Sequence, residues 1–430
     1  MNNKRRTIGL LGTISIGIGG MIGAGIFSII GIGCQIGGNA VYVSFIIAGI
    51  VALLSSYSYA KLGVKYPSAG GAVEYLIRGF GDNIISGGFN ILLWVGYIFA
   101  LSLYARAFGS YAMTFFPTIS HYWLNIFATI IIIIFIIVNF IGAKAVGSSE
   151  FFIVIIKISV LIFFSIIGFF SLKSDFLSIS QWPSMNNIFF SAAILFLAYE
   201  GFGLIANAAE DMKEPEKTLP KALYMSVAIV IAIYVSVSLT ITGNLPISKI
   251  IIARDYALAE AAKPFLGLIG FKIMAIAALF STSSAINATL YGGTNVSYLM
   301  AKEGELPAFF QRKVWGRGVE GLFITAGLVI LIANLFDLSK IAMLGSAFFL
   351  LIYGAVNIAH LRLYKKTKAN SFIICLSIAG CFSIFAILIY FLLKNSPLTL
   401  IAFIVVLMAS FLIEGYIAVS YTHLTLPTKA

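Results

Sequence analysis

A run of 54 consecutive residues without Asp, Glu, Lys or Arg extends from Thr7 to Ala60, and this run limits the folds open to the chain. One helix in a soluble core uses only part of such a length, whereas roughly 20 apolar residues cross a bilayer as a helix. Similar runs recur along the 430 residues, of which 10% are charged, against about 25% in an ordinary soluble protein. The composition therefore excludes a soluble globular protein.

The apolar runs do not alternate between polar and apolar residues, which favours membrane-spanning helices over a β-barrel. Turn and charge signals divide the runs into about twelve spans. We therefore predict an all-α polytopic membrane protein embedded in the lipid bilayer. The expected spans are 7–31, 39–61, 86–115, 122–142, 149–171, 186–209, 221–243, 268–300, 319–336, 340–362, 371–393 and 397–418.

Lysine and arginine are distributed unevenly between the two sides of the membrane. If the amino terminus is cytoplasmic, the loops and span ends on that side carry 19 of these residues and the opposite side carries 7. Because such an excess marks cytoplasmic loops, we predict that both termini are cytoplasmic. The net charge of +12 belongs to these loops, so no nucleic-acid partner is expected. The expected location is the cell membrane, either a plasma membrane or a bacterial inner membrane.

Residues that carry metal-dependent or catalytic chemistry are sparse. The three histidines are far apart, and no pair of carboxylates occurs at membrane depth. The cysteines lie in apolar stretches without the spacing of a metal site, and we expect small core residues at Cys34, Cys375 and Cys381. The sequence therefore predicts no metal, no cofactor and no enzyme, and leaves a channel or a receptor as alternatives to a carrier.

Two predicted spans, five apart, contain glycines at mid-membrane depth. The first span contains Gly17, Gly19, Gly20, Gly23 and Gly25, and the sixth contains Gly201 and Gly203. Each glycine weakens a helix by up to about 1 kcal/mol, so both clusters favour local unwinding. Paired interrupted helices in two halves indicate an inverted-repeat transporter. Close packing between helices is the alternative explanation.

Ionisable side chains inside the spans are functional candidates, since each costs at least roughly a few kcal/mol there. Glu200, at the centre of the sixth span, is expected to recognise an amine or carry a proton; a structural carboxyl held by hydroxyls of the eighth span is the alternative. Lys157 lies nine residues into the fifth span, where burial favours the neutral amine. It is a candidate for proton coupling, with a permanently charged structural strut as the alternative. Arg106 is expected to extend to the membrane interface.

Several segments resemble motifs of a known family, in the family's order. They are Ile16–Phe27 (IGIGGMIGAGIF), Tyr66–Tyr75 (YPSAGGAVEY), Phe196–Gly203 (FLAYEGFG), Asn207–Asp211 (NAAED), Ser281–Ala288 (STSSAINA) and Met300–Pro307 (MAKEGELP). They resemble the first, sixth and eighth helices and two cytoplasmic loops of amino-acid permeases of the amino acid, polyamine and organocation superfamily. The resemblance extends through most of the chain.

The resemblance implies two five-helix inverted repeats, residues 1–171 and 186–362, followed by two peripheral helices in residues 371–418. It also implies alternating-access transport of amino acids or related amines. The expected function is proton-coupled secondary active transport, and a sodium-independent amino-acid or polyamine exchanger is the alternative. Residues 420–430 depart from the family pattern, show no helical period, and are expected to be a non-native tail.

An amino-acid substrate needs donors for its carboxylate and acceptors for its ammonium. The half-helix after the first break directs its positive end and its N–H groups at an anion. The residues expected near the carboxylate are Gly23, Ala24 and Gly25. Unwound carbonyls are expected to accept from the ammonium near Met21, Leu197 and Glu200, a division of roles that resembles the family's.

Two aromatic residues adjoin the second break. Tyr199 and Phe202 are expected to flank the substrate's side chain or close the site, and ordinary aromatic packing is the alternative.

The position of Lys157 resembles that of the helix-five lysine in proton-coupled members of the family. That lysine takes the place of a sodium ion, against helix-one carbonyls and helix-eight hydroxyls. The expected hydroxyls here belong to Ser281 and Ser284, which are three residues apart and so share one helical face. Transport is therefore expected to use a proton and no sodium ion.

Overall fold

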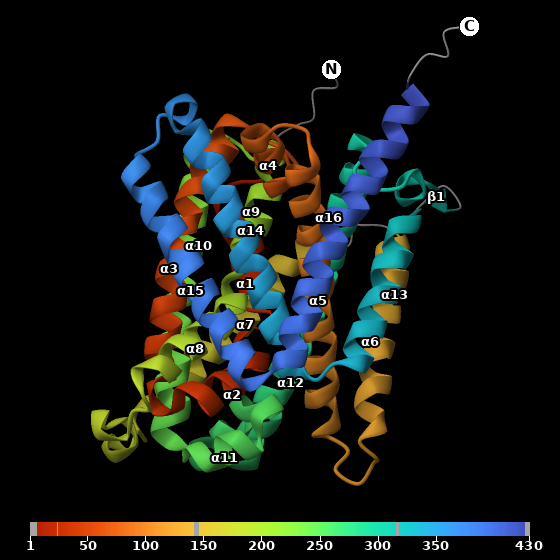
Figure 1. The fold of residues 1–430 in the computed structure, drawn as a ribbon. Helices are drawn as coiled ribbons and strands as arrows, with labels where there is room; N and C mark the ends of the chain where they lie inside the picture. The colour runs from red at the N-terminus through yellow and green to blue at the C-terminus, as the bar shows by residue number, and fades with distance from the viewer. Residues whose placement is uncertain (1–6, 24, 142–145, 315–317, 426–430) are drawn as a thin grey trace, which may run out of the picture.

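The computed structural model describes residues 7–23, 25–141, 146–314 and 318–425. It is a bundle of helices that run between two opposite faces (Figure 1). Within the described residues, ten helical stretches are long and apolar enough to cross a membrane, and Leu10–Met21 and Glu320–Leu335 are shorter apolar helices. The prediction of an all-α polytopic membrane protein is confirmed.

The α-helices and the shorter 3₁₀ helices, labelled η, follow one another with few extended segments. The first are α1 (Leu10–Met21), α2 (Gly25–Gly37), η1 (Gly38–Ala40), α3 (Val41–Lys65), α4 (Ala72–Phe80), α5 (Ile84–Met113), α6 (Tyr122–Ile141) and α7 (Val146–Phe169). Next come η3 (Ser174–Leu177), η4 (Ile179–Gln181), α8 (Met185–Leu195), η5 (Phe196–Tyr199), α9 (Phe202–Asn207), η6 (Ala209–Asp211), α10 (Pro215–Asn244), α11 (Ile247–Ile252), η7 (Arg254–Tyr256) and α12 (Ala257–Glu303).

The last third of the chain adds one short hairpin and four long helices. These elements are η8 (Ala308–Gln311), β1 (Lys313–Val314), β2 (Gly318–Val319), α13 (Glu320–Leu335), α14 (Leu338–Thr367), α15 (Ser371–Asn395) and α16 (Pro397–Thr425). The two strands are antiparallel, with Lys313 opposite Val319.

Each of the twelve predicted spans coincides with at least one helix, and the first and sixth are interrupted, as expected from their glycines. Three features differ from the prediction. The short helix α4 occupies part of a segment expected to be a loop. Non-helical backbone at Gly267, with φ of 62°, divides α12 just before the predicted start of the eighth span. The helix α16 continues to Thr425, into the segment 420–430 whose sequence shows no helical period, and residues 426–430 lie outside the described part.

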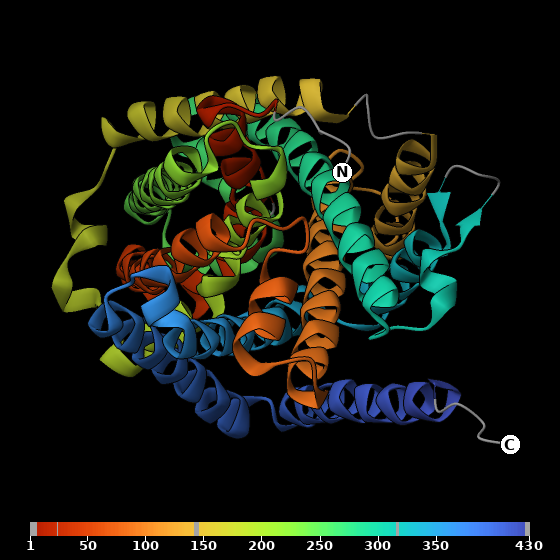
Figure 2. The same cartoon turned by 90° about the horizontal axis from the view of Figure 1, so that it is seen from above.

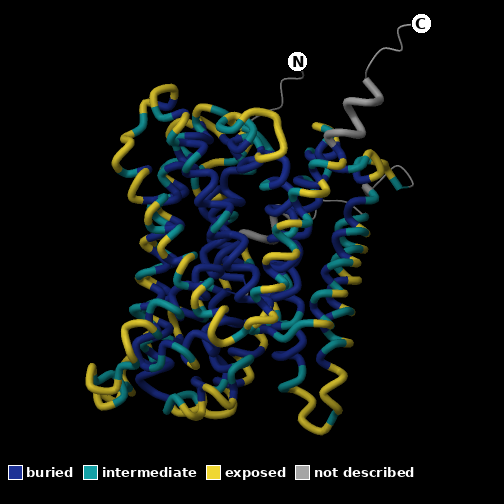
Figure 3. The backbone as a smooth tube through the Cα atoms, viewed as in Figure 1, coloured by how far each residue is buried: buried dark blue, intermediate teal, exposed yellow. Residues whose placement is uncertain are grey.

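Burial divides the helices into a protein-facing and a membrane-facing group. Figure 3 shows the buried backbone concentrated in the middle of the bundle. Most of α5 and of the α8–α9 segment is buried, whereas α6, α7, α15 and α16 leave most of their apolar residues uncovered. Figure 2 shows α15 and α16 along one edge of the bundle. The uncovered apolar surface fits contact with lipid chains.

The segment before α1 is tied to the segment after α9. The backbone N–H of Lys213 donates to the carbonyl of Ile8 at 2.8 Å, and the N–H of Ile8 donates to the carbonyl of Asp211 at 3.0 Å. These bonds join the outer ends of two half-helices, α1 and α9, on the face of the molecule that carries the amino terminus (Figure 1).

Candidate functional site

The interruption between α1 and α2 lies directly against the interruption between η5 and α9. A Cβ atom on Gly201 would overlap the backbone of Gly20 and Met21, and a Cβ atom on Gly25 would lie 2.9 Å from the Cα atom of Ala198. Only glycine permits backbones to approach so closely. The glycines therefore allow close packing at the same place where the helices are interrupted. Both explanations given from the sequence, local unwinding and close packing, apply here.

Tyrosine hydroxyls satisfy carbonyl groups at the interruptions. The Tyr234 hydroxyl, on α10, lies 2.5 Å from the carbonyl oxygen of Met21 and 3.1 Å from that of Ala198, and so connects both interruptions. The Tyr353 hydroxyl, on α14, donates to the Glu200 carbonyl at 2.5 Å. Neither tyrosine was among the predicted site residues. Nothing in the sequence distinguishes these two from the other tyrosines among the 20 in the chain.

The Glu200 side chain is buried, with 1% of its surface exposed. Its Oε1 atom accepts a hydrogen bond of 2.8 Å from the Tyr104 hydroxyl on α5. Its Oε2 atom has no hydrogen-bond partner among the described residues. The alternative in which hydroxyls of the eighth span hold this carboxyl is therefore wrong, because the hydroxyl that contacts it comes from the third span. One carboxylate oxygen is left to accept from a ligand.

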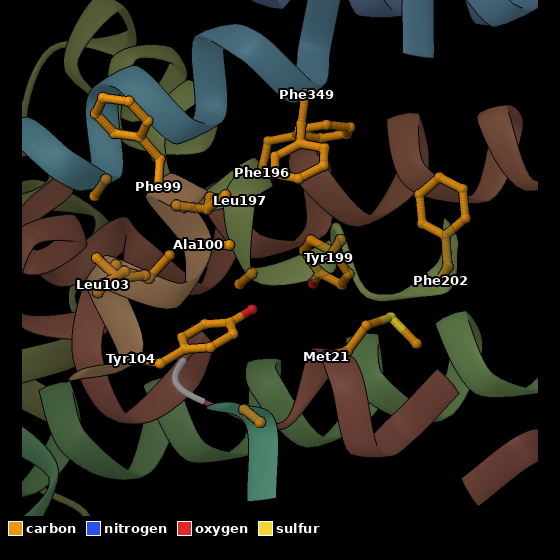
Figure 4. Close-up of a cluster of buried hydrophobic side chains, with 14 of the residues drawn as sticks. Met21, Phe99, Ala100, Leu103, Tyr104, Phe196, Leu197, Tyr199, Phe202 and Phe349 are labelled. Atoms are coloured by element: carbon orange, nitrogen blue, oxygen red, sulfur yellow. The ribbon is translucent and has the colours of Figure 1, made fainter. Parts of the chain in front are cut away.

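Side chains from three parts of the chain converge on the second interruption. Figure 4 shows Met21 of α1, Tyr104 of α5 and the segment with Leu197 and Tyr199 around one space, with the Tyr104 hydroxyl directed toward that segment. All four of these residues are at most 2% exposed. The site is closed to solvent in this structure.

The two aromatic residues of the second interruption are engaged in packing. The Tyr199 hydroxyl donates to the carbonyl of Phe45 on α3 at 2.9 Å. The ring of Phe202 lies 4.7 Å, centroid to centroid, from that of Tyr353. These contacts correspond to the packing alternative. The two residues also lie at the second interruption itself.

The carbonyls expected to bind an ammonium already accept from protein groups. The Leu197 carbonyl accepts from the backbone N–H of Glu200 at 3.2 Å. The carbonyls of Met21 and Glu200 accept from Tyr234 and Tyr353. A carbonyl oxygen has two lone pairs, so the carbonyls of Met21 and Leu197 retain capacity for a second donor. The Glu200 carbonyl does not, because it also accepts from the backbone N–H of Gly203 at 3.1 Å.

Lys157 and Ser281 reach the first interruption from different helices. The ammonium of Lys157, on α7, donates to the carbonyl of Gly19 at 2.9 Å, and the side chain is 1% exposed. The Ser281 hydroxyl, on α12, lies 2.7 Å from the carbonyl oxygen of Ile22 and 2.9 Å from that of Gly23. Ser281 thus holds two consecutive carbonyls of the unwound segment, and Lys157 holds a carbonyl in the last turn of α1 just before it.

Two of the predicted site residues remain. Ser284 is buried on α12, three residues after Ser281. Ala24 lies outside the described residues.

Other predicted features have different surroundings from those expected. Arg106 donates to the Ala333 carbonyl, at the end of α13, at 2.8 Å, so it is bonded to protein rather than only to the interface. Cys34 and Cys381 are buried, but Cys375 is exposed, which corrects its assignment to the core. No group of three or more His, Cys, Asp and Glu residues that could hold a metal ion occurs within the described residues.

Two cavities, of about 420 and 380 Å³, open near the face opposite the amino terminus. They lie on either side of η7, because Asp255 lines the first and Arg254 lines the second. These two residues form an ion pair of 2.9 Å. None of the residues that line these cavities belongs to either interruption.

Comparisons with known proteins cover nearly the whole chain. Residues 8–418 match the family described as amino acid permease. An uncharacterised protein of Methanocaldococcus jannaschii is 40% identical over 91% of this chain and 90% of its own length. The inner membrane transport protein YbaT of Escherichia coli is 34% identical over 86% of each chain. The serine/threonine exchanger SteT of Bacillus subtilis is 28% identical over 89% of this chain and 90% of its own length.

The family match includes both interrupted helices, α7 with Lys157 and α12 with Ser281. The chain therefore belongs to the amino acid permease family of the amino acid, polyamine and organocation superfamily.

Proposed function

We propose that this protein is a secondary active transporter that moves amino acids by alternating access and couples their movement to protons through Lys157. Family membership supports the broader statement that it is a multi-pass amino-acid transporter and not an enzyme. The observation that carries the finer proposal is the buried Lys157 ammonium, bonded to the Gly19 carbonyl at the first interruption.

Coupling follows from the difference between a charged and a neutral lysine at this place. A charge-assisted hydrogen bond is roughly twice as strong as a neutral one, so the protonated form holds α1 firmly against α7. Loss of the proton weakens this contact and frees α1 to change its position. A proton taken up on one side and released on the other thereby biases the protein between its outward-open and inward-open states.

The substrate is proposed to lie between the two interruptions, with its carboxylate at the start of α2 near Gly23, Ala24 and Gly25. Its ammonium would meet the carbonyls near Met21, Leu197 and Glu200. The unpartnered Oε2 of Glu200 supports a positively charged group there, because a buried carboxylate oxygen without a donor is costly. We also propose that residues 1–171 and 186–362 form inverted repeats around this substrate.

The alternatives are a sodium-independent exchanger of amino acids or polyamines, a channel and a receptor. The name of the Bacillus relative, a serine/threonine exchanger, gives exchange some support. Burial of the residues at both interruptions supports a carrier with a closed state over an open pore.

Two measurements on the purified protein test the proposal. A thermal-shift screen of all amino acids and polyamines identifies the substrate, since a ligand that binds only the native state stabilises it. Uptake of that labelled substrate into proteoliposomes is then measured with a proton gradient, with a sodium gradient, or with unlabelled substrate inside. We expect saturable accumulation driven by the proton gradient alone. Sodium dependence or exchange without accumulation contradicts proton coupling, and flux that does not saturate indicates a channel.

Replacing Glu200 by Gln is expected to weaken substrate binding about 10- to 100-fold. A hydrogen bond to a charged group contributes about 1.5–3 kcal/mol, and Gln keeps the acceptor for Tyr104 while removing the negative charge. The dissociation constant is measured by thermal-shift titration. Glu210, exposed on η6, provides the control Glu210→Gln, which should bind normally. Equal substrate affinities in the two variants would indicate that Glu200 has only a structural role.

We further propose that both termini face the cytoplasm and that the protein lies in the cell membrane; the name of the Escherichia coli relative, an inner membrane protein, supports this location. Single cysteines in place of Lys217 and Lys173, in a chain without its natural cysteines, test the orientation. These exposed residues lie near the beginning and the end of α10, on opposite faces. In intact cells an impermeant thiol reagent should label only Lys173→Cys. Labelling of only Lys217→Cys reverses the orientation.

A further inference from the structure

A second group of buried acids lies away from the interruptions, near the beginning of α5. Glu305 follows the end of α12 and is 3% exposed, and Asn90 on α5 is fully buried. The Asn90 amide nitrogen lies 2.8 and 2.9 Å from the two carboxyl oxygens of Glu305. Neither residue takes part in the proposed transport mechanism.

A third buried side chain reaches the same face of α5 from α16. Glu414 is 6% exposed, and its carboxyl lies directly on Gly87, where a Cβ atom would overlap it. Gly87 and Asn90 are three residues apart, so Glu305 and Glu414 approach one face of α5. Figure 1 shows α16 alongside α5 at the end of the bundle that carries both chain termini.

Two polar atoms of this group need a donor. The side-chain carbonyl oxygen of Asn90 and the Oε2 atom of Glu414 are buried without a hydrogen-bond partner among the described residues. An unsatisfied buried acceptor costs about 1–3 kcal/mol. A proton on either carboxyl supplies an O–H donor and removes one of two buried negative charges. The unpartnered acceptors therefore point to a bound proton.

The surrounding charges act in the same direction. Burial, together with the negative charges of Glu414, Asp82 and Glu303, raises the pKa of the Glu305 carboxyl to about 7 against the opposing hydrogen bond from Asn90. These acids come from α16, from the turn before α5 and from α12. The Glu305 carboxyl therefore changes its charge near neutral pH.

We propose that Glu305, Asn90 and Glu414 form a proton-binding site that fastens the segment after α12 to α5 and α16. With the proton bound, the three side chains share hydrogen bonds and the segment is docked. Without it, two buried carboxylates repel each other and the segment is released. Because α12 also carries Ser281, docking or release of this segment connects the pH on this face to the contacts of Ser281 at the first interruption. It is independent of Lys157 and of the proposed coupling.

The direction of the pH effect follows from linkage. A docked Glu305 binds its proton more tightly than a solvent-exposed one, whose pKa is 4.5. Docking is therefore strengthened as pH falls from 8 toward 4.5, and this stabilisation is lost as pH rises through about 7. Between pH 6 and pH 8 the docking equilibrium should change about tenfold.

Hydrogen exchange of backbone amides in the full-length protein, in lipid nanodiscs, tests the site. After correction for the intrinsic rates, amides of residues 304–311 should exchange about tenfold faster at pH 8 than at pH 6. Glu305→Gln, which imitates the protonated side chain, should keep the slow exchange at both pH values. Glu210→Gln, an exposed acid on η6 that is not among the groups raising the pKa of Glu305, should keep the wild-type pH dependence.

Two further results would overturn the proposal. One is the same pH dependence in Glu305→Gln and in the control Glu210→Gln. The exchange buffer contains choline as its cation. The other result is slow exchange at pH 8 once sodium or potassium replaces choline in that buffer, which would assign the site to a metal cation. If Glu305→Gln does not fold, Glu414→Gln tests the same site from α16, and an unchanged pH dependence there contradicts the proposal equally.

Discussion

Replacing Gly25 by Val is expected to abolish substrate binding while the protein still inserts in the membrane. The first atom added at this position would lie 2.9 Å from the Cα atom of Ala198 and from the Tyr234 hydroxyl. A branched side chain adds two further carbons there, and the neighbours on one side are backbone, which cannot rotate away. The two interruptions must therefore move apart, and the proposed binding groups separate with them.

Binding is measured as stabilisation by the ligand that the thermal-shift screen identifies. At a concentration 100 times the dissociation constant, the wild-type protein gains about 2.7 kcal/mol, and the Gly25→Val variant should gain nothing. Gly327→Val is the matched control, because a Cβ atom at this exposed position on α13 meets nothing within 4 Å. Normal affinity in Gly25→Val would move the substrate site away from the first interruption.

The bundle was predictable because its signals are strong and local. Long uncharged runs have few solutions other than membrane helices, and glycine clusters in two of them marked both interruptions. Features that depend on single residues were less accessible. Gly267 ends one helical stretch before the eighth span, and α4 lies in a segment whose Pro67, Gly70 and Gly71 suggest a loop.

At the candidate site, the sequence identified residues that are unusual in a membrane and missed those that are common there. Glu200 and Lys157 stand out because burying a charge is costly. Tyr104, Tyr234 and Tyr353 do not stand out, since tyrosine is amphipathic and packs in most apolar helices. Their hydroxyls can be assigned only when the distances to Glu200 and to the carbonyls are known.

The Glu305 site illustrates the same limit over a longer range. Glu305 and Asn90 are 215 residues apart, and Glu414 comes from a peripheral helix. Within the sequence, Glu305 belongs to a charged loop motif that is typical of a solvated turn. Only the burial of Glu305 on Asn90 and the packing of Glu414 on Gly87 show that two acids approach one face of α5.

Replacing Lys157 by Ala is expected to abolish accumulation driven by a proton gradient, lowering the ratio of internal to external substrate by at least about tenfold, to unity. Alanine removes both the amine that binds the proton and its hydrogen bond to the Gly19 carbonyl, so the position of α1 no longer responds to pH. Substrate binding and exchange of internal for external substrate should persist, because the Ser281 hydroxyl still holds the neighbouring carbonyls. Uptake and counterflow in the same proteoliposomes measure the two activities separately.

Lys157→Arg distinguishes a coupling lysine from a structural strut. Arginine keeps the positive charge and donates to carbonyls, but it does not lose its proton in proteins. A strut therefore accepts arginine and retains accumulation, whereas a coupling residue does not. We expect Lys157→Arg to bind substrate, as the thermal-shift assay reports, and to fail in proton-driven accumulation like Lys157→Ala. Accumulation by either variant under a proton gradient would remove Lys157 from the coupling mechanism and leave it a role in holding α1 to α7.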